Sequence, residues 1–214
     1  MPEQKMKTTH SKHLPLNLLL GTIVVALALL WSSIAPYDRA TWWMEVAPVL
    51  LVYPVLWMSR RSFVWTDLLY ILIMMHALVL IVGGAYTYAR VPFGFWLQDL
   101  LGDSRNPYDK IGHFMQGFVP ALAAREWLWR RAWVRSLRVA SVLAVCVAMT
   151  LSTVYELLEW LAAVLLGQGA DEFLGTQGYA WDTQSDMGFA LLGALMGMVL
   201  LSALHNRQMN QHKF

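Results

Sequence analysis

The sequence has little charge and almost no cysteine. Only 14% of its 214 residues are charged, against about 25% in a typical soluble domain, and 57% are hydrophobic. It shows no internal repeat, no low-complexity tract and no hydrophilic domain. These absences exclude a soluble globular domain, and the single cysteine, Cys146, excludes an intrachain disulfide. We interpret Cys146 as a small buried apolar residue rather than as a reactive thiol.

The sequence contains six apolar runs. A helix needs about twenty residues to cross a bilayer. The runs cover approximately 14–35, 44–58, 65–85, 111–128, 139–164 and 187–204. The first is interpreted as a retained anchor, and the fourth holds polar residues that favour a face turned into the bundle. Eleven tryptophans also suit membrane interfaces. The chain is therefore predicted to be an all-α polytopic membrane protein, with one six-helix transmembrane bundle (14–204) between terminal tails (1–13 and 205–214).

The basic residues predict the orientation of this bundle. With the N-terminus inside, twelve of the sixteen lysines and arginines fall on the cytoplasmic side of the six runs. Both termini are then cytoplasmic. Tryptophans alternate with arginines over 125–135, as they also do on some nucleic-acid-binding surfaces. Contact with anionic lipid headgroups explains this stretch better, so we expect the lipid bilayer, and no nucleic acid, as a partner.

Three pairs of ionisable residues accompany the apolar runs, and each pair has the spacing of one helix face. The pairs are Asp109 with His113, Glu156 with Glu159, and Asp182 with Asp186. Ionised groups in a spanning segment are costly, so they normally face a cavity, a partner or a metal.

Helical rise predicts that the three pairs reach the same face of the membrane. Glu156 lies eighteen residues beyond Arg138, which is about 27 Å along a helix. Asp186 and His113 lie about 31 Å and about 26 Å from the cytoplasmic-side arginines of their own runs. Because the hydrocarbon core is about 30 Å thick, all three arrive near its outer boundary. The sequence therefore predicts a periplasm-facing Asp/His/Glu cluster.

Five carboxylates at a low-dielectric boundary repel one another unless protons or a cation neutralise them. We therefore predict one divalent metal ion, with magnesium, manganese, iron and zinc left open. Its predicted ligands are Asp109, His113, Glu156, Glu159, Asp182 and Asp186. Of these, Glu156, Glu159 and His113 are the predicted catalytic residues. Arg105 and Arg90 are predicted to bind an anionic group of the substrate.

Other interpretations of these residues stay open. Arg105, Arg90 and Lys110 lie on the same predicted side and offer another way to neutralise the cluster. The two glutamates suit a buried hydrogen-bonded pair, and aspartates often cap helices. His76, about 16 Å into the third run, suits an interhelical hydrogen bond or a proton relay. Glycines near the end include a Gly-x-x-x-Gly step, which favours close helix packing.

Three of these segments resemble a known family. The stretches 108–114, 155–160 and 178–186 are similar to those of YjdF-type bacterial inner-membrane proteins, and the likeness covers nearly the whole chain. It implies a multi-pass protein of the bacterial inner membrane and no particular activity. The layout of an Asp/His segment, an acidic helix and a final Asp segment is also similar to that of VanZ-like membrane proteins.

Three functions are compatible with the sequence. The first is a metal-dependent hydrolase or transferase that acts on a lipid headgroup or a lipid-linked substrate. The second is a cation or proton-coupled transporter, although the chain lacks the repeated halves typical of many transporters. The third is a non-catalytic membrane partner protein whose polar cluster is structural.

Overall fold

The computed structural model describes residues 14–166 and 177–211. Within these ranges all regular secondary structure is helical, with seven helices and no strand. The helices are α1 (Leu16–Ile34), α2 (Arg39–Ser59), α3 (Asp67–Tyr86), α4 (Pro92–Leu101), α5 (Tyr108–Arg130), α6 (Leu137–Leu166) and α8 (Asp182–Gln211). The predicted all-α class is confirmed.

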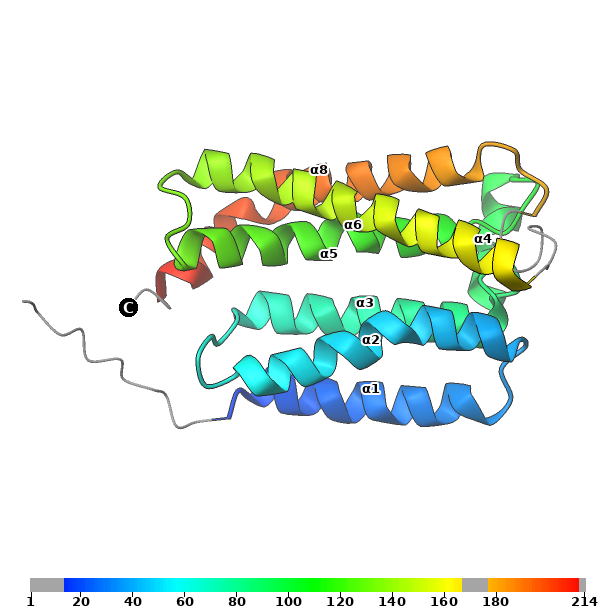
Figure 1. Ribbon diagram of the computed structural model, residues 1–214, viewed down its shortest axis with the longest axis horizontal. Helices are drawn as coiled ribbons and strands as arrows, with labels where there is room; N and C mark the ends of the chain where they lie inside the picture. Colours follow the sequence, from blue (N-terminus) through cyan, green and yellow to red (C-terminus); the bar gives the residue numbers. More distant parts are fainter. Residues whose placement is uncertain (1–13, 167–176, 212–214) are drawn as a thin grey trace, which may run out of the picture.

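The long helices form two groups of three (Figure 1). Helices α1, α2 and α3 pack together, as do α5, α6 and α8, and contacts between α3 and α5 join the two groups. The short helix α4 lies at one end of the bundle, which we call the α4 end. Helix α1 begins and α8 ends at the opposite end (Figure 1).

Five helices are long and apolar enough to cross a membrane, namely α1, α2, α3, α6 and α8. Helix α5 has 23 residues and packs against α3, α6 and α8 in the bundle, but it is less apolar than the others because polar and charged residues occur along it. Its ionisable residues include Asp109, His113, Arg125 and Glu126. The prediction of a multi-span helical membrane protein is therefore confirmed, and the count of six spans stays a prediction.

Helices α2, α5, α6 and α8 extend beyond the apolar runs that predicted them. Helix α2 begins five residues before the run at 44, because Asp38 caps it: its Oδ1 accepts the Thr41 N–H at 2.7 Å. The same helix continues through Pro48 and Pro54. Helix α4 was not predicted, since its ten residues are too few for a span. Helix α8 continues past 204 to Gln211, and the predicted tail at 1–13 lies outside the described residues.

The outer surface of the bundle is apolar. Large hydrophobic side chains are exposed along α1, α2, α6 and α8, as expected where lipid tails surround a protein. The interpretation of Cys146 as buried was wrong, since its side chain is exposed on α6. Ala144 and Ala148, which are fully buried, form the inner face of that helix, and Cys146 lies halfway between them in sequence and so on another face.

Small residues bring α5 and α8 into close contact. A Cβ atom added at Gly193 would overlap the carbonyl of Phe114, and one added at Gly117 would overlap the carbonyl of Ala190. Gly197 lies against Phe118 in the same interface. The predicted role of the Gly-x-x-x-Gly step is therefore confirmed for Gly193 and Gly197.

We expect Gly193→Ala to destabilise the protein by about 1–3 kcal/mol, because the added methyl group must push two backbones apart. Gly188→Ala, in the same helix, is the matched control, since a Cβ there meets no atom within 4 Å. Thermal unfolding of both variants in detergent checks the prediction. Equal midpoints for the two variants would show that the α5–α8 contact tolerates separation.

A buried polar network joins α3, α5 and α8 at the end opposite α4. Glu126 accepts hydrogen bonds from the Thr66 backbone and hydroxyl, from Arg130 and from His205. His205 Nδ1 lies 3.2 Å from an Arg125 nitrogen, and arginine only donates, so Nδ1 accepts and Nε2 carries the proton given to Glu126. Glu126 and His205 are fully buried, so the network ties the three helix ends together inside the protein.

Candidate functional site

The three predicted pairs of ionisable residues converge at the α4 end of the bundle. Asp109 and His113 lie in the first two turns of α5, and Asp182 and Asp186 in the first two turns of α8. Glu156 lies on α6 beside them, with an oxygen 3.6 Å from His113 Nδ1. The close crossing of α5 and α8 through their glycines is what allows side chains of both helices to meet here.

Asp109, His113 and Asp186 form the tightest group. Each offers one ligand atom, and these three atoms lie within 4.8 Å of one another. His113 Nε2 is 3.4 Å from Asp109 Oδ1 and 4.0 Å from Asp186 Oδ2. All three side chains are largely enclosed by protein, with 14% exposure or less. These three residues therefore form a candidate metal-binding group, which we call the candidate metal group.

The tautomer of His113 supports a cation at this position. His113 Nδ1 lies 3.0 Å from Gln116 Oε1, and an amide oxygen can only accept. Nδ1 therefore carries a proton, and in the neutral ring Nε2 presents a lone pair to Asp109 and Asp186. Three electron-rich atoms then face one another, and a cation, a shared proton or protonation of the ring at Nε2 offsets their repulsion. Metal-binding histidines typically donate their second N–H to a carbonyl in this way.

Two carboxylate oxygens near this group lack hydrogen-bond partners. Asp186 Oδ1 and Glu156 Oε1 are buried without a partner among the described residues, and the two residues are only 2% and 8% exposed. An unsatisfied buried polar atom costs about 1–3 kcal/mol, and more when it is charged. Such oxygens are commonly satisfied by a proton, an ordered water or an ion.

The basic residues near the site are engaged with other partners. Arg105 forms an ion pair with Asp182 and lies over the ring of Tyr179. Lys110 donates a hydrogen bond to Asp103 at 3.1 Å, and this contact lowers the pKa of the Asp103 carboxyl from its ordinary value. Arg105 therefore neutralises Asp182, one of the six predicted metal ligands.

Arg90 does not join the group. Its guanidinium lies 4.1 Å from the ring centre of Tyr37, between the ends of α1 and α2, and its side chain is exposed. The structure thus brings Arg105 to the edge of the predicted site, and the role of Arg90 in substrate binding stays a prediction.

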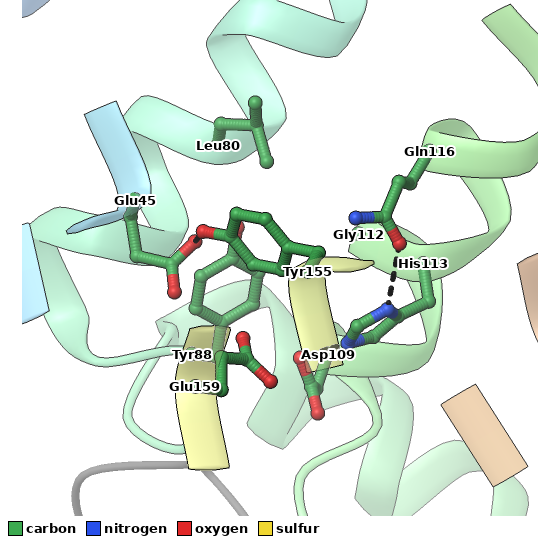
Figure 2. Close-up of a pocket in the computed structure, with 9 residues that line it drawn as sticks. All are labelled: Glu45, Leu80, Tyr88, Asp109, Gly112, His113, Gln116, Tyr155 and Glu159. Atoms are coloured by element: carbon green, nitrogen blue, oxygen red, sulfur yellow. Dashed lines mark hydrogen bonds and ion pairs between the residues drawn. The ribbon is translucent and has the colours of Figure 1, made fainter. Parts of the chain in front are cut away.

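A cavity of about 20 Å³ adjoins Asp109 and His113 of the candidate metal group (Figure 2). By this measure a water molecule needs roughly 10–15 Å³, so the cavity has room for one water or one small ion. Both three-helix groups contribute to its walls. It is lined by Glu45, Leu80, Tyr88, Asp109, Gly112, His113, Gln116, Tyr155 and Glu159. Glu159 and Asp109 both line the cavity, and Figure 2 shows their carboxylates near one another.

Glu45 is the first of two site residues that the sequence did not identify. It lies on α2, is 6% exposed, and accepts a hydrogen bond from the Tyr155 hydroxyl at 3.0 Å. Its approach depends on Gly84, because a Cβ added there would lie 2.9 Å from Glu45 Cβ. A lone acidic residue inside an apolar run was the available signal. It was overlooked because it has no partner at helical spacing.

His76 lies on α3, one helical turn before the cavity residue Leu80. Its Nε2 is buried and has no hydrogen-bond partner among the described residues. The expectation of an interhelical hydrogen bond is therefore not met by this nitrogen.

Gln116 is a second residue that the sequence did not identify, and it provides a test of the site. We expect Gln116→Ala to weaken metal binding about 10–100-fold, because the imidazole loses the acceptor that fixes its tautomer. Gln116→Glu, which keeps an acceptor, should restore binding. Isothermal titration of the purified protein with Mn²⁺ measures both effects. Unchanged affinity in Gln116→Ala would mean that Gln116 does not orient a ligand.

The fold and the site together define a multi-pass helical membrane protein with a buried acidic and imidazole centre at one end of its bundle. Residues 17–207 match the family model described as predicted membrane protein (DUF2238), and the chain belongs to this family. Over 197 residues the chain is 52% identical to the inner membrane protein YjdF of Escherichia coli (strain K12). The aligned region covers 92% of this chain and 94% of that protein. No solved structure matches the chain.

These findings confirm the resemblance to YjdF-type proteins. They also confirm that the chain is a multi-pass protein of the bacterial inner membrane, in agreement with its five apolar helices.

Proposed function

We propose that this protein is a metal-dependent membrane enzyme, a hydrolase or transferase that acts on a lipid headgroup or a lipid-linked substrate. The single observation that supports it most is the group formed by His113 Nε2, Asp109 and Asp186, three acceptor atoms within 4.8 Å of one another. The proposal includes six spans, with α5 as the sixth, both termini in the cytoplasm and the α4 end at the periplasmic face.

The proposed metal ligands are Asp109, His113 and Asp186, with Glu156 as the fourth. One nitrogen and three carboxylate ligands suit a divalent ion such as Zn²⁺, Mn²⁺ or Fe²⁺. When bound, the ion would polarise a phosphoryl or carbonyl oxygen and acidify a water molecule. The exposed apolar flanks of the bundle keep this chemistry within reach of membrane lipids.

The remaining site residues act on the substrate and on protons. Glu159 faces the cavity next to Asp109 and is placed to accept a proton from a water held there. Arg105 already holds Asp182, so it can orient an anionic headgroup at the edge of the site without leaving that carboxylate unpaired. Gln116 holds the imidazole in the tautomer that a metal requires.

The test is the metal content of the protein purified from its native membrane in mild detergent. About one equivalent of a divalent metal is expected in the wild type, and Asp186→Asn should lose most of it. Asp103→Asn is the matched control, because Asp103 pairs with Lys110 and does not reach the group. Phosphate or headgroup release from phospholipid vesicles should then depend on the metal and stop with EDTA. A metal-free wild type would overturn the proposal and favour a structural role for the cluster.

A second candidate function is a cation or proton-coupled transporter, and His76 is the observation that favours it. A buried imidazole nitrogen without a partner, one turn from the cavity, is a suitable next station for a proton or cation. Ion flux into proteoliposomes measures this function directly. Flux that His76→Ala abolishes would select the transporter over the enzyme.

A further inference from the structure

Helix α4 presents an apolar face that no other described part of the protein covers. Its apolar residues recur at positions 93, 96, 97, 100 and 101, which is the spacing of one side of a helix. The side chains of Phe93, Trp96, Leu100 and Leu101 are each more than half exposed. The rings of Phe93 and Trp96 stack on this side, with their centroids 5.5 Å apart. A contiguous exposed apolar face of this kind marks an interaction surface.

Helix α4 is anchored to the start of α5, which carries part of the site. Asn106, which is 2% exposed, donates from Nδ2 to the Val91 carbonyl at 3.0 Å, and its Oδ1 accepts the Tyr108 N–H at 3.0 Å. Gly94 is the one buried residue of α4, and it lies against the Asn106 side chain with no room for a Cβ atom. These contacts hold the start of α4 beside the first turn of α5, where Asp109 lies.

Exposed aromatic residues mark the level at which α4 lies. Tryptophan and tyrosine are enriched at membrane–water interfaces, because each has an apolar ring and a polar N–H or O–H group. At the α4 end, such residues are exposed on both three-helix groups, at the ends of α1, α2, α6 and α8. We call these residues the aromatic belt, and they are Trp31, Tyr37, Trp43, Trp160, Tyr179 and Trp181.

From these observations we infer that α4 is an interfacial helix, whose apolar face lies in the lipid leaflet at the α4 end of the bundle. Amphipathic helices of this kind bury their apolar face about 5–10 Å into the boundary between headgroups and acyl chains. The aromatic belt favours lipid as the occupant of this face, because a protein partner on α4 would not call for exposed rings on both three-helix groups. The one charged residue of α4, Asp99, is exposed and lies outside the apolar face, so it can stay in water.

The interfacial position of α4 determines the depth of the site. Because Asn106 ties α4 to the first turn of α5, Asp109 lies close to the level of the lipid headgroups of that leaflet. A headgroup can then meet the site without leaving its leaflet. The inference holds whether or not the site binds a metal, so it goes beyond the proposed function and does not rest on it.

Spin-label accessibility in the full-length protein tests the interfacial helix. Cys146→Ala removes the only native cysteine, and Leu100→Cys then carries a nitroxide label on the apolar face. The protein is reconstituted into vesicles of phosphatidylethanolamine and phosphatidylglycerol, with a water-soluble nickel chelate on both sides of the bilayer. Power saturation compares collisions of the label with oxygen, which dissolves in lipid, and with nickel. Asp99→Cys is the matched control on the same helix, and Val199→Cys, exposed on the outside of α8, gives the value for lipid.

The label at Leu100 should collide more with oxygen than with nickel, as at Val199, and the label at Asp99 more with nickel. More collisions with nickel at Leu100 would place α4 in water and overturn the inference. Few collisions with either reagent would show that protein covers the face, which also overturns it. Leu101→Cys repeats the measurement on the same face if Leu100→Cys does not fold. None of these outcomes bears on metal content, so this test and that of the proposed function can fail separately.

Discussion

Glu126→Leu is expected to destabilise the protein by about 3–5 kcal/mol, which is the typical cost of removing one partner from a buried charge network. The carboxylate accepts from Thr66, Arg130 and His205, and it is fully buried. Leucine fills a similar volume but leaves these donors without an acceptor. The arginine charge then has no counter-ion inside the protein.

Thermal unfolding in detergent, followed by circular dichroism, measures this effect. Asp67→Asn is the matched control, because Asp67 lies at the same end of α3 and, among the described residues, its side chain makes one exposed hydrogen bond, with Asn17. The Asp67→Asn substitution should lower the free energy of unfolding by at most about 1 kcal/mol. If both variants unfold at the same temperature, the network does not hold the ends of α3, α5 and α8 together.

His113→Ala is expected to reduce metal affinity by more than the 10–100-fold expected for Gln116→Ala. His113 is the only nitrogen ligand in the group, and its ring faces Asp109, Asp186 and Glu156 at distances of 3.4–4.0 Å. Alanine leaves the carboxylates facing one another with no imidazole between them. The remaining oxygen ligands would hold a transition metal weakly.

Titration with Mn²⁺ and with Zn²⁺ separates this effect from a general loss of structure. His76→Ala is the matched control, since it removes an imidazole from the bundle but not from the group. Zinc binding should suffer more than manganese binding in His113→Ala, because zinc favours nitrogen ligands. Wild-type affinity in His113→Ala would contradict the assignment of the imidazole as a ligand.

The sequence predicted the class of fold and the meeting of three acidic segments, because both follow from simple periodicity. Long apolar runs dictate helices, and a rise of 1.5 Å per residue places Glu156, Asp186 and His113 at a common depth. Counting residues along a helix gives the depth of a side chain but not the direction in which it points around the helix axis. It therefore did not separate Asp182, which pairs with Arg105, from Asp186, which lies in the group with Asp109 and His113.

Contacts between helices that are distant along the chain could not be predicted from the sequence. Glu45 reaches the site only because Gly84 lets α2 approach α3 closely, and its bond to Tyr155 spans 110 residues. Gln116 was visible as a polar residue of α5, but its role depends on the orientation of the His113 ring. Helix α4 was not predicted, because a ten-residue segment resembles neither a membrane span nor a polar loop.

The division of the bundle into two groups of three helices has a consequence for biosynthesis. The cavity takes Glu45 from the first group and Asp109 and Tyr155 from the second, and the adjoining group takes Asp186 from the last helix. A nascent chain that has inserted only its first half therefore holds Glu45 without the other residues of the site. The complete set of site residues comes together only after the ribosome has delivered α8, so formation of the site is coupled to completion of the chain.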